Sequence, residues 1–330
     1  MSENTGWSRQ STLSVVVPAF REAPNLERLL PALMAQLAEL VDCFEIVVVN
    51  DGSRDGTDEL MASLPADWPV HYLSLSRNFG KEAALTAGLD AARGDAVILM
   101  DADFQHPLSV LPEFFRHWQQ GYDMVFAVRA DRSRESWLKR HGTRFFYRMM
   151  SQGSDIEIVP DAGDFRLLDR KVVQALRQLP ERNRFMKGMY AWVGFRTLSI
   201  EYVPDERLEG DSAFGMAALF RLAFTGLTAF TDLPLRIWSG LGALVSLIAL
   251  AYGAFIVLST LLFGKDVPGY ATIVTSIMFF SGVQLLSVGV LGEYLARVYT
   301  EVKQRPTYLI GVERDQSPLS AQTHLPAQES

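Results

Sequence analysis

Cysteine is nearly absent from this 330-residue chain, which contains only Cys43. A single cysteine excludes an intramolecular disulfide and any metal site built from several thiolates. A basic excess is also missing, because 31 lysines and arginines stand against 38 aspartates and glutamates, a net charge of −7. Proteins that bind nucleic acid normally carry a positive surface, so nucleic acid is not an expected partner. The five histidines show no H-x-x-H or H-E-x-x-H spacing, and a histidine-built metal centre is not expected either.

Two common phosphate-binding motifs are missing as well. No G-x-G-x-x-G follows the first apolar run, and no G-x-x-x-x-G-K-[ST] occurs anywhere in the chain. The first absence speaks against a dinucleotide-dependent enzyme and the second against an ATPase of the P-loop type.

Charge is absent from two long apolar runs, residues 237–263 and 267–292. Each exceeds the roughly 20 residues that a helix needs to cross a bilayer, so they predict two transmembrane helices joined by a tight turn at residues 264–266. The alternative is a helical hairpin buried in a large soluble core. The N-terminus is polar and predicts no signal peptide. Basic residues flank the pair on its outer ends (Arg221, Arg236, Arg297, Lys303 and Arg305), whereas the turn contains only Lys265. This distribution places both ends, and the large domain before them, on the cytoplasmic side of the inner membrane.

The first 235 residues alternate apolar strand patterns with helical patterns, which is typical of βαβ units around a mostly parallel sheet with helices on both faces. Strands are predicted at residues 13–17, 44–49, 70–75, 96–100 and 124–128, and helices at residues 26–40 and 81–92. A further helix should begin near Asp55, capped by Ser53 or Asp55. In such sheets the ligand lies beyond the carboxyl ends of the strands, so the polar residues there are the candidates for function.

Asp101 and Asp103 form the strongest chemical pattern at these strand ends. Residues two apart on an extended chain point to the same side, so both carboxylates can converge on one cation, with Gln105 adding an amide oxygen. Oxygen ligands without histidine or thiolate select Mg²⁺ or Mn²⁺. The alternative is a pair of loop-capping aspartates. His106 precedes a proline and is expected to serve a turn rather than a metal.

Several segments together resemble a known enzyme family. Val15–Glu22, Asn50–Thr57 and Asp101–Gln105 are similar to glycosyltransferase family 2, whose domain has the GT-A fold. Further segments resemble the polyprenyl-phosphate glycosyltransferases within it, namely the dolichol-phosphate mannosyltransferases and the bactoprenol glucosyltransferases; these segments are Ser76–Gly80, Ala84–Gly88, Gly163–Leu167 and Glu181–Phe185. The likeness runs from about Leu13 to Leu309 and includes both apolar runs.

The resemblance implies a role for individual residues. The nucleoside of a UDP- or GDP-linked sugar would be held by Pro18, Phe20, Glu22 and Asp51. Asp101, Ala102, Asp103 and Gln105 would surround the metal and the diphosphate, and Arg129 would meet the donor phosphates or the sugar. Arg207 and Ser212 would bind the acceptor phosphate, and Arg182 with Arg184 either assists them or forms a solvated face. Taken alone, Asp51 is an ordinary turn residue and Glu22 a helix cap, but beside the other motifs both are predicted to bind the nucleotide.

The expected chemistry needs no strong base. A lipid phosphate already carries close to two negative charges at pH 7, so it is a competent nucleophile without the help that a sugar hydroxyl requires. Catalysis would rest on positioning and on a cation that neutralises the departing nucleoside diphosphate. Asp164 is the next carboxylate expected near the sugar, as an orienting group or weak base, and a structural role is the alternative.

Other segments predict contact with membrane lipids. Arg140, Arg144 and Arg148 share one face of a predicted helix, which could lie on anionic lipid or form a solvated face. Residues 213–236 predict interfacial helices. One departure from the family concerns the acceptor site, because Ala213 stands where a lysine is usual.

The predicted organisation follows from these points. A polar tail (1–12) precedes an α/β catalytic domain (13–212) and the juxtamembrane helices (213–236). Two membrane spans (237–263 and 267–292), a cytoplasmic segment (293–312) and an unstructured tail (313–330) follow. The predicted reaction is inverting transfer of a hexose, with glucose favoured, to undecaprenyl phosphate. The alternatives are another sugar (mannose, galactose, N-acetylhexosamine or aminoarabinose), another lipid acceptor, or a non-catalytic membrane adaptor. The sequence leaves open whether the chain forms a homo-oligomer.

Overall fold

The computed structural model describes residues 10–129, 162–182, 184–202 and 269–320, together with short stretches between residues 242 and 262. The chain divides into two compact units. In the described residues the first unit contains an α/β domain built on one sheet, and the second contains the long helix α10 (Tyr270–Val302). Within the α/β domain, the order of elements is β1 (Thr12–Ala19), α1 (Ala23–Leu40), β2 (Cys43–Asn50), α2 (Thr57–Ser63), β3 (Val70–Leu75), α3 (Lys81–Ala91), β4 (Ala96–Leu99), η1 (Leu108–Val110), α4 (Leu111–Gln119), β5 (Met124–Arg129), β6 (Ala162–Asp169), α6 (Arg170–Gln178), α7 (Met186–Trp192), β7 (Thr197–Tyr202) and β8 (Ile310–Asp315).

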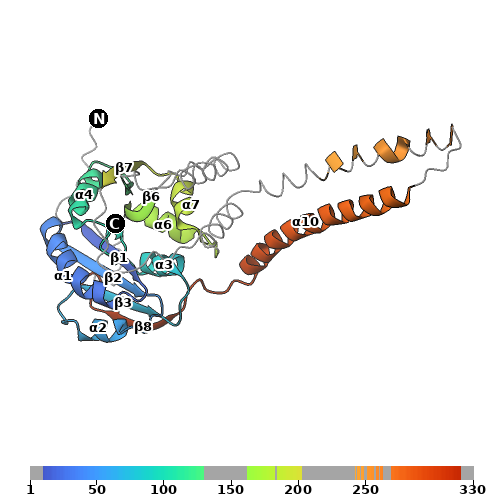
Figure 1. The fold of residues 1–330 in the computed structure, drawn as a ribbon. Helices are drawn as coiled ribbons and strands as arrows, with labels where there is room; N and C mark the ends of the chain where they lie inside the picture. Colours follow the sequence, from blue (N-terminus) through green and yellow to red (C-terminus); the bar gives the residue numbers. More distant parts are fainter. Residues whose placement is uncertain are drawn as a thin grey trace, which may run out of the picture. The chain divides into compact units, whose positions relative to one another are not determined.

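The strands form a mixed sheet of eight in the order β7-β5-β6-β4-β1-β2-β3-β8 (Figure 1). Neighbours in the centre, β4, β1, β2 and β3, run parallel, whereas β6 and β8 are antiparallel to the strands beside them. The α/β class with a mostly parallel sheet is therefore confirmed. Since the four central strands point the same way, the segments after Ala19, Asn50, Leu75 and Leu99 meet at one edge of the sheet.

Helices cover both faces of the sheet, which explains why β1 is apolar at nearly every position. Val15 and Val17 belong to a core cluster that includes residues of α1 and α4. Val16 points to the other face, where α3 approaches so closely that a Cβ on Gly88 would lie 2.2 Å from the Val16 side chain. A larger residue at position 88 would push α3 away from the sheet, so glycine is required there by packing.

The predicted strands and helices of the α/β domain are confirmed, with small differences at their ends. The first helix begins three residues earlier than expected, at Ala23, because Pro24 is favourable in the first turn of a helix. The helix expected near Asp55 begins at Thr57, with Gly56 rather than Ser53 or Asp55 as its N-cap residue and without a side-chain capping hydrogen bond. Asp55 instead accepts hydrogen bonds from the Thr57 N–H (3.3 Å) and hydroxyl (2.6 Å).

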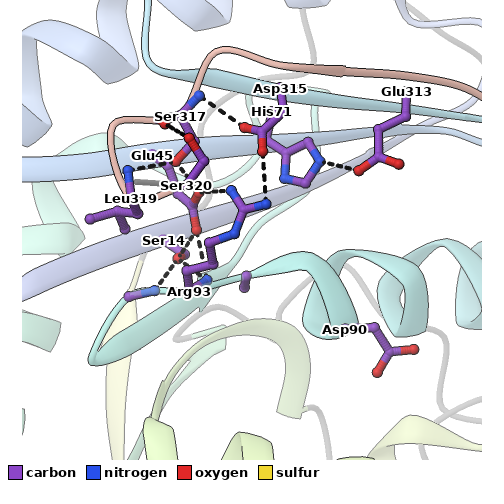
Figure 2. A network of polar contacts seen from close by, with 12 residues as sticks. Ser14, Glu45, His71, Asp90, Arg93, Glu313, Asp315, Ser317, Leu319 and Ser320 are labelled. Carbon is purple, nitrogen blue, oxygen red and sulfur yellow. Dashed lines mark hydrogen bonds and ion pairs between the residues drawn. The ribbon is translucent and has the colours of Figure 1, made fainter. Parts of the chain in front are cut away.

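The segment after α10 returns to the sheet as its edge strand, β8, which pairs antiparallel with β3. Below it, the buried Glu45 carboxylate accepts a hydrogen bond from Ser14 (2.6 Å) at one oxygen and from Ser317 at the other (Figure 2). Arg93 forms an ion pair of 2.7 Å with Asp315. These contacts tie the C-terminal segment to the first two strands of the domain.

The prediction of an unstructured tail from residue 313 is therefore wrong for its first part. Residues 313–315 lie in β8, and Ser317 is buried. Strand formation here depends on pairing with β3, some 240 residues away in the chain, and the polar local sequence carries no sign of it. The rest of the predicted tail, residues 321–330, lies outside the described residues.

One helix of the described part of the chain, within α10, is long and apolar enough to cross a membrane. This segment, Phe279–Val302, overlaps the second predicted span and continues beyond it, since α10 ends at Val302 rather than near residue 292. The first predicted span, residues 237–263, is described only in short pieces, and residues 213–236 with Arg140, Arg144 and Arg148 lie outside the described residues.

Candidate functional site

A cavity of about 310 Å³ opens at the carboxyl ends of the central strands. Its lining residues come from the end of β1 and from the segments that follow β1, β2, β3 and β4: Pro18, Ala19, Phe20, Glu22, Asp51, Asn78, Gly80, Lys81, Ala84, Asp101, Ala102 and Asp103. The structure thus brings together every residue that was predicted to hold the nucleoside, and both predicted metal-binding aspartates. Ala19, Asn78, Gly80, Lys81 and Ala84 were not predicted.

The segment after β1 presents an aromatic ring at this cavity. Phe20 is 41% exposed, and the guanidinium of Arg21 lies 5.2 Å from the centre of its ring. Glu22 precedes α1 but makes no capping hydrogen bond with its side chain, which instead accepts one from the Asn25 amide at 2.5 Å. An exposed ring beside a carboxylate offers one surface for stacking a base and one acceptor for its polar edge or for the ribose.

Asp51, at the end of β2, holds the neighbouring loop in place. Its two carboxylate oxygens accept hydrogen bonds from the N–H groups of Phe79 (2.7 Å) and Gly80 (2.9 Å). Burial raises the pKa of this carboxyl, although the two N–H groups act in the opposite direction. Gly52 makes this contact close, because its φ is +68° and a Cβ there would lie 2.3 Å from the Arg77 backbone. Asp51 therefore fixes the loop that leads into α3, and its remaining lone pairs are available to a ligand.

Asp101 and Asp103 follow β4 in a tight turn. Asp103 accepts a hydrogen bond from the Gln105 N–H (3.2 Å), and the backbone at Phe104 has φ +59°. His106 is buried, stacks on Phe165 with ring centres 4.4 Å apart, and accepts a hydrogen bond from the Asp101 N–H at 3.1 Å. This confirms the expected turn role of His106.

A lysine that sequence reasoning missed joins two of the predicted carboxylates. Lys81 Nζ lies 2.6 Å from Asp101 Oδ1 and 3.0 Å from Asp164 Oδ2. The antiparallel register of β4 and β6, which pairs Leu99 with Arg166, brings Asp164 beside Asp101. One feature of the sequence could have indicated this contact. Lys81 is the first residue of a helix, where the helix dipole disfavours a positive charge unless nearby anions offset it.

Asp164 has a largely enclosed carboxylate, 13% exposed, with one oxygen in use. Its Oδ2 faces Lys81, whereas Oδ1 has no hydrogen-bond partner in the described part of the chain. Burial would raise the pKa of Asp164, but Lys81 and other nearby cations lower it below its ordinary value. Native proteins rarely leave such an oxygen unpaired, so Asp164 Oδ1 is a candidate acceptor for a ligand hydroxyl.

Glu82 neighbours this group and accepts a hydrogen bond from the Met186 N–H at 3.0 Å. Burial, followed by the negative charge of Asp164, raises the pKa of Glu82 to about 7, while Lys81 and Lys187 act in the opposite direction. The folded protein therefore keeps a proton on Glu82 at pH values where the unfolded chain, with an ordinary pKa of 4.5, has released it.

This raised pKa predicts a pH-dependent stability. The contribution of Glu82 to the free energy of unfolding is fully present below pH 4.5, the pKa in the unfolded chain, and is lost as the pH rises through about 7. The loss amounts to up to about 3 kcal/mol. Between pH 5 and pH 8 the melting temperature of the wild type should fall further than that of Glu82→Gln, by about 5 °C. The glutamine retains an acceptor for Met186 but does not titrate. Parallel pH profiles of the two proteins in thermal unfolding would contradict the assignment.

The remaining predicted site residues are only partly described. The guanidinium of Arg184 donates from Nε to Glu181 O (3.1 Å), from Nη2 to Leu179 O (2.9 Å) and from Nη1 to Thr86 (3.4 Å), so much of its donor capacity serves the loop before α7. Arg182 lies in the same loop. Arg207, Ser212, Ala213 and the side chain of Arg129 lie outside the described residues.

A larger cavity, of about 620 Å³, lies at the opposite ends of the strands. Its charged side chains form ion pairs with one another or hydrogen bonds with the backbone. Arg177 donates to the last carbonyls of α3, including Leu89 O at 3.0 Å, and His71 contacts Glu313 at 2.9 Å. The smaller cavity is the better candidate site, because it lies at the carboxyl ends of the parallel strands, where α/β sheets bind their ligands.

No set of three or more histidine, cysteine, aspartate or glutamate side chains in the described ranges is grouped so that it could hold a metal ion by itself. Asp101 and Asp103 nevertheless supply oxygen donors at the cavity. Mg²⁺ and Mn²⁺ commonly use one or two carboxylates and complete their shell with water and substrate phosphates. The donor set is thus compatible with an ion that binds together with a phosphorylated ligand.

Comparison with known proteins gives a consistent assignment. Residues 14–177 match the model of "Glycosyl transferase family 2". The chain is 46% identical over 299 residues to an uncharacterised glycosyltransferase of Synechocystis sp., covering 90% of this chain and 94% of that protein. It is also 46% identical over 303 residues to a bactoprenol glucosyl transferase of Shigella phage SfII, covering 90% of this chain and 97% of that protein.

Solved structures give only distant matches. A mannosyltransferase from Pyrobaculum calidifontis, in complex with GDP-Man and Mn²⁺, aligns with a TM-score of 0.41 and 15% identity, covering 89% of this chain and 87% of that one. Glucosyl-3-phosphoglycerate synthase from Mycobacterium tuberculosis aligns with a TM-score of 0.43 and 19% identity, covering 68% and 82% of the two chains. The assignment rests on the sequence relatives.

Proposed function

Because this chain belongs to glycosyl transferase family 2, we propose that it transfers a glucosyl group from a nucleoside diphosphate glucose to a polyprenyl phosphate, with undecaprenyl phosphate as the acceptor. The observation that carries the proposal is the 46% identity, over nearly the full length of both chains, to a protein named bactoprenol glucosyl transferase. The cavity at the strand ends supports it, because its lining offers an aromatic ring for a base and carboxylates for a metal-bound diphosphate.

The donor nucleotide would bind along the ends of β1 and β2. Phe20 would stack on the base, and Glu22 and Asp51 would accept hydrogen bonds from the base or the ribose, with Pro18 and Ala102 closing the cavity around them. UDP-glucose is the favoured donor. Since Asp51 also holds Phe79 and Gly80, nucleotide binding and the position of α3 would be linked through this one carboxylate.

The diphosphate would bind at the end of β4 together with Mg²⁺ or Mn²⁺. Asp101 and Asp103 would hold the ion, with Gln105 contributing from the same turn. When bound, the ion would neutralise the charge that develops on the departing nucleoside diphosphate. Arg129 would add a positive charge to the donor phosphates or contact the sugar.

The acceptor would act through its phosphate oxygen. Attack on C1 of glucose forms the new C–O bond as the bond from C1 to the diphosphate oxygen breaks, so an α-linked donor gives a β-linked product. The acceptor phosphate is already largely ionised at pH 7, and the protein must mainly align it. Asp164 would orient the sugar through Oδ1, the oxygen that has no partner among the described residues.

The acceptor lipid would reach the site from the membrane surface. We assign its phosphate to Arg207 and Ser212, assisted by Arg182 and Arg184, although Arg184 already serves its own loop. The two apolar runs would anchor the catalytic domain at the cytoplasmic face, and Phe279–Val302 is apolar enough for such a role. Membrane lipids would then contact the chain directly and also surround its lipid acceptor.

A panel of donors tests this function directly. Full-length protein in lipid nanodiscs containing undecaprenyl phosphate is incubated with UDP-glucose, UDP-galactose, UDP-N-acetylglucosamine and GDP-mannose, each radiolabelled in the sugar. UDP-glucose should give a lipid-linked monophosphate sugar at least about tenfold faster than the others, consistent with discrimination at a polar pocket. A different preferred sugar would correct the donor, and no transfer with any donor would favour a non-catalytic adaptor.

A further inference from the structure

Lys81 occupies an unusual position in the candidate site. Its ammonium group lies between two carboxylates, 2.6 Å from Asp101 Oδ1 and 3.0 Å from Asp164 Oδ2. Asp101 is also the proposed ligand of the divalent cation. The same carboxylate therefore has two candidate cations, one from the protein and one from solution.

The position of Lys81 is set by the backbone of the loop before it. Asp51 holds the N–H groups of Phe79 and Gly80, so the chain enters α3 from a fixed point at the end of β2. Gly80 has φ +98°, a conformation that side chains disfavour. Lys81 is the first residue of α3, where the helix dipole disfavours a cation and the two carboxylates offset that cost. The segments that follow β2, β3 and β4 thus place the Lys81 ammonium group at the cavity.

The ammonium group can leave Asp101 without a large penalty. The Lys81 side chain is 46% exposed, so the ammonium regains hydration when it moves, whereas the Asp164 side chain is only 13% exposed and depends on Lys81 as a counterion. A doubly charged ion bound by Asp101 and Asp103 would compete directly with the ammonium group for Asp101, whereas the contact with the less exposed Asp164 would remain.

We propose that Lys81 is a positioning residue that holds Asp101 and Asp164 in place before the donor binds, and that it yields Asp101 to the divalent cation while staying on Asp164. This inference rests on the proposed function. Its consequence is that Lys81 weakens metal binding in the absence of the nucleotide, because the cation must first displace an ammonium group. With the donor present, the diphosphate supplies further negative charge and the cation binds as part of the complex.

The test is the affinity for Mn²⁺ alone, measured by electron paramagnetic resonance of the free ion with full-length protein. In Lys81→Met, removal of one positive charge beside Asp101 should tighten Mn²⁺ binding about tenfold. Lys81→Arg should bind Mn²⁺ as weakly as the wild type. Lys171→Met is the matched control, because Lys171 also forms an ion pair, of 2.6 Å with Asp123, and lies outside the cavity. It should leave Mn²⁺ affinity unchanged.

The same variants should change catalysis in the opposite direction. In Lys81→Met the turnover number should fall at least about tenfold, since Asp164 loses its counterion and its fixed position, while the KM for the donor changes little. Lys81→Arg should recover part of the turnover. A residue needed only for folding would lower metal affinity and turnover together, so the opposite signs distinguish the two roles.

Unchanged or weaker Mn²⁺ binding by Lys81→Met would overturn the proposal, as would equal turnover in Lys81→Met and the wild type. If Lys81→Met does not fold, Lys81→Gln serves the same purpose. Loss of the proposed function has a separate signature, because Mn²⁺ affinity needs no sugar donor. If Lys81→Met binds Mn²⁺ more tightly but the wild type transfers no sugar, the competition between Lys81 and the cation for Asp101 stands. Only the assigned reaction is then refuted.

Discussion

Replacement of Asp103 by asparagine is expected to lower the rate of glucosyl transfer at least about 100-fold, with little effect on folding. The structure places Asp103 at the cavity, where its Oδ1 accepts one hydrogen bond from the Gln105 N–H at 3.2 Å. Asparagine has the same shape and keeps an oxygen for that bond, but it removes the negative charge that a divalent cation requires. Loss of a few kcal/mol of charge stabilisation corresponds to about two orders of magnitude in rate.

The measurement is the initial rate with UDP-glucose and undecaprenyl phosphate in nanodiscs, at saturating Mg²⁺ and then after chelation by excess EDTA. Wild-type activity should disappear with EDTA and return when Mg²⁺ or Mn²⁺ is added. Asp67→Asn is a suitable control, because Asp67 is exposed in the connection between α2 and β3 and is not among the residues lining the cavity. A near-normal rate for Asp103→Asn, or for the wild type in EDTA, would refute the metal assignment.

Replacement of Asp164 by asparagine should lower the turnover number about 100-fold while the KM for the donor stays within about threefold of the wild type. The Asp164 side chain is 13% exposed, uses Oδ2 for Lys81 and has no partner for Oδ1 among the described residues. Asparagine retains one oxygen but loses the charge that faces Lys81. The sugar would then be held less precisely, and a misplacement of about 1 Å is enough for a loss of this size.

The comparison with Glu82→Gln makes this result specific. Glu82 neighbours Asp164 and is expected to be protonated in much of the protein at neutral pH, since its pKa is raised to about 7. Glu82→Gln should therefore change turnover far less than Asp164→Asn. If Asp164→Asn retains most of the wild-type turnover, Asp164 has a structural role, which is the alternative that the sequence left open.

The positions of the nucleotide candidates could be predicted from the sequence because they depend on short-range patterns. Buried strands appear as apolar runs, and the polar residues directly after them must lie at one edge of a parallel sheet. For this reason Phe20, Asp51, Asp101 and Asp103 were predicted to lie together, and the structure places all four around one cavity. Their functional roles stay predictions.

The sequence by itself also determined the family, because the motifs that resemble glycosyltransferase family 2 are contiguous segments. Such segments can be recognised without knowing how the chain folds. The relatives at 46% identity extend it over 90% of the chain. The apolar run of residues 267–292 likewise predicted a long helix, which continues as α10 to Val302 because Glu293, Leu295, Ala296 and Arg297 directly after it favour helix.

Only the tertiary structure decided which charges meet. Lys81 and Asp164 are 83 positions apart, and their contact exists because the register of β4 and β6 brings Asp164 beside Asp101. Likewise, β8 is a strand because β3 offers it an unpaired edge, although the second half of its sequence, Glu313–Asp315, is polar. Contacts of this kind depend on how distant segments pair, and no local pattern records that pairing.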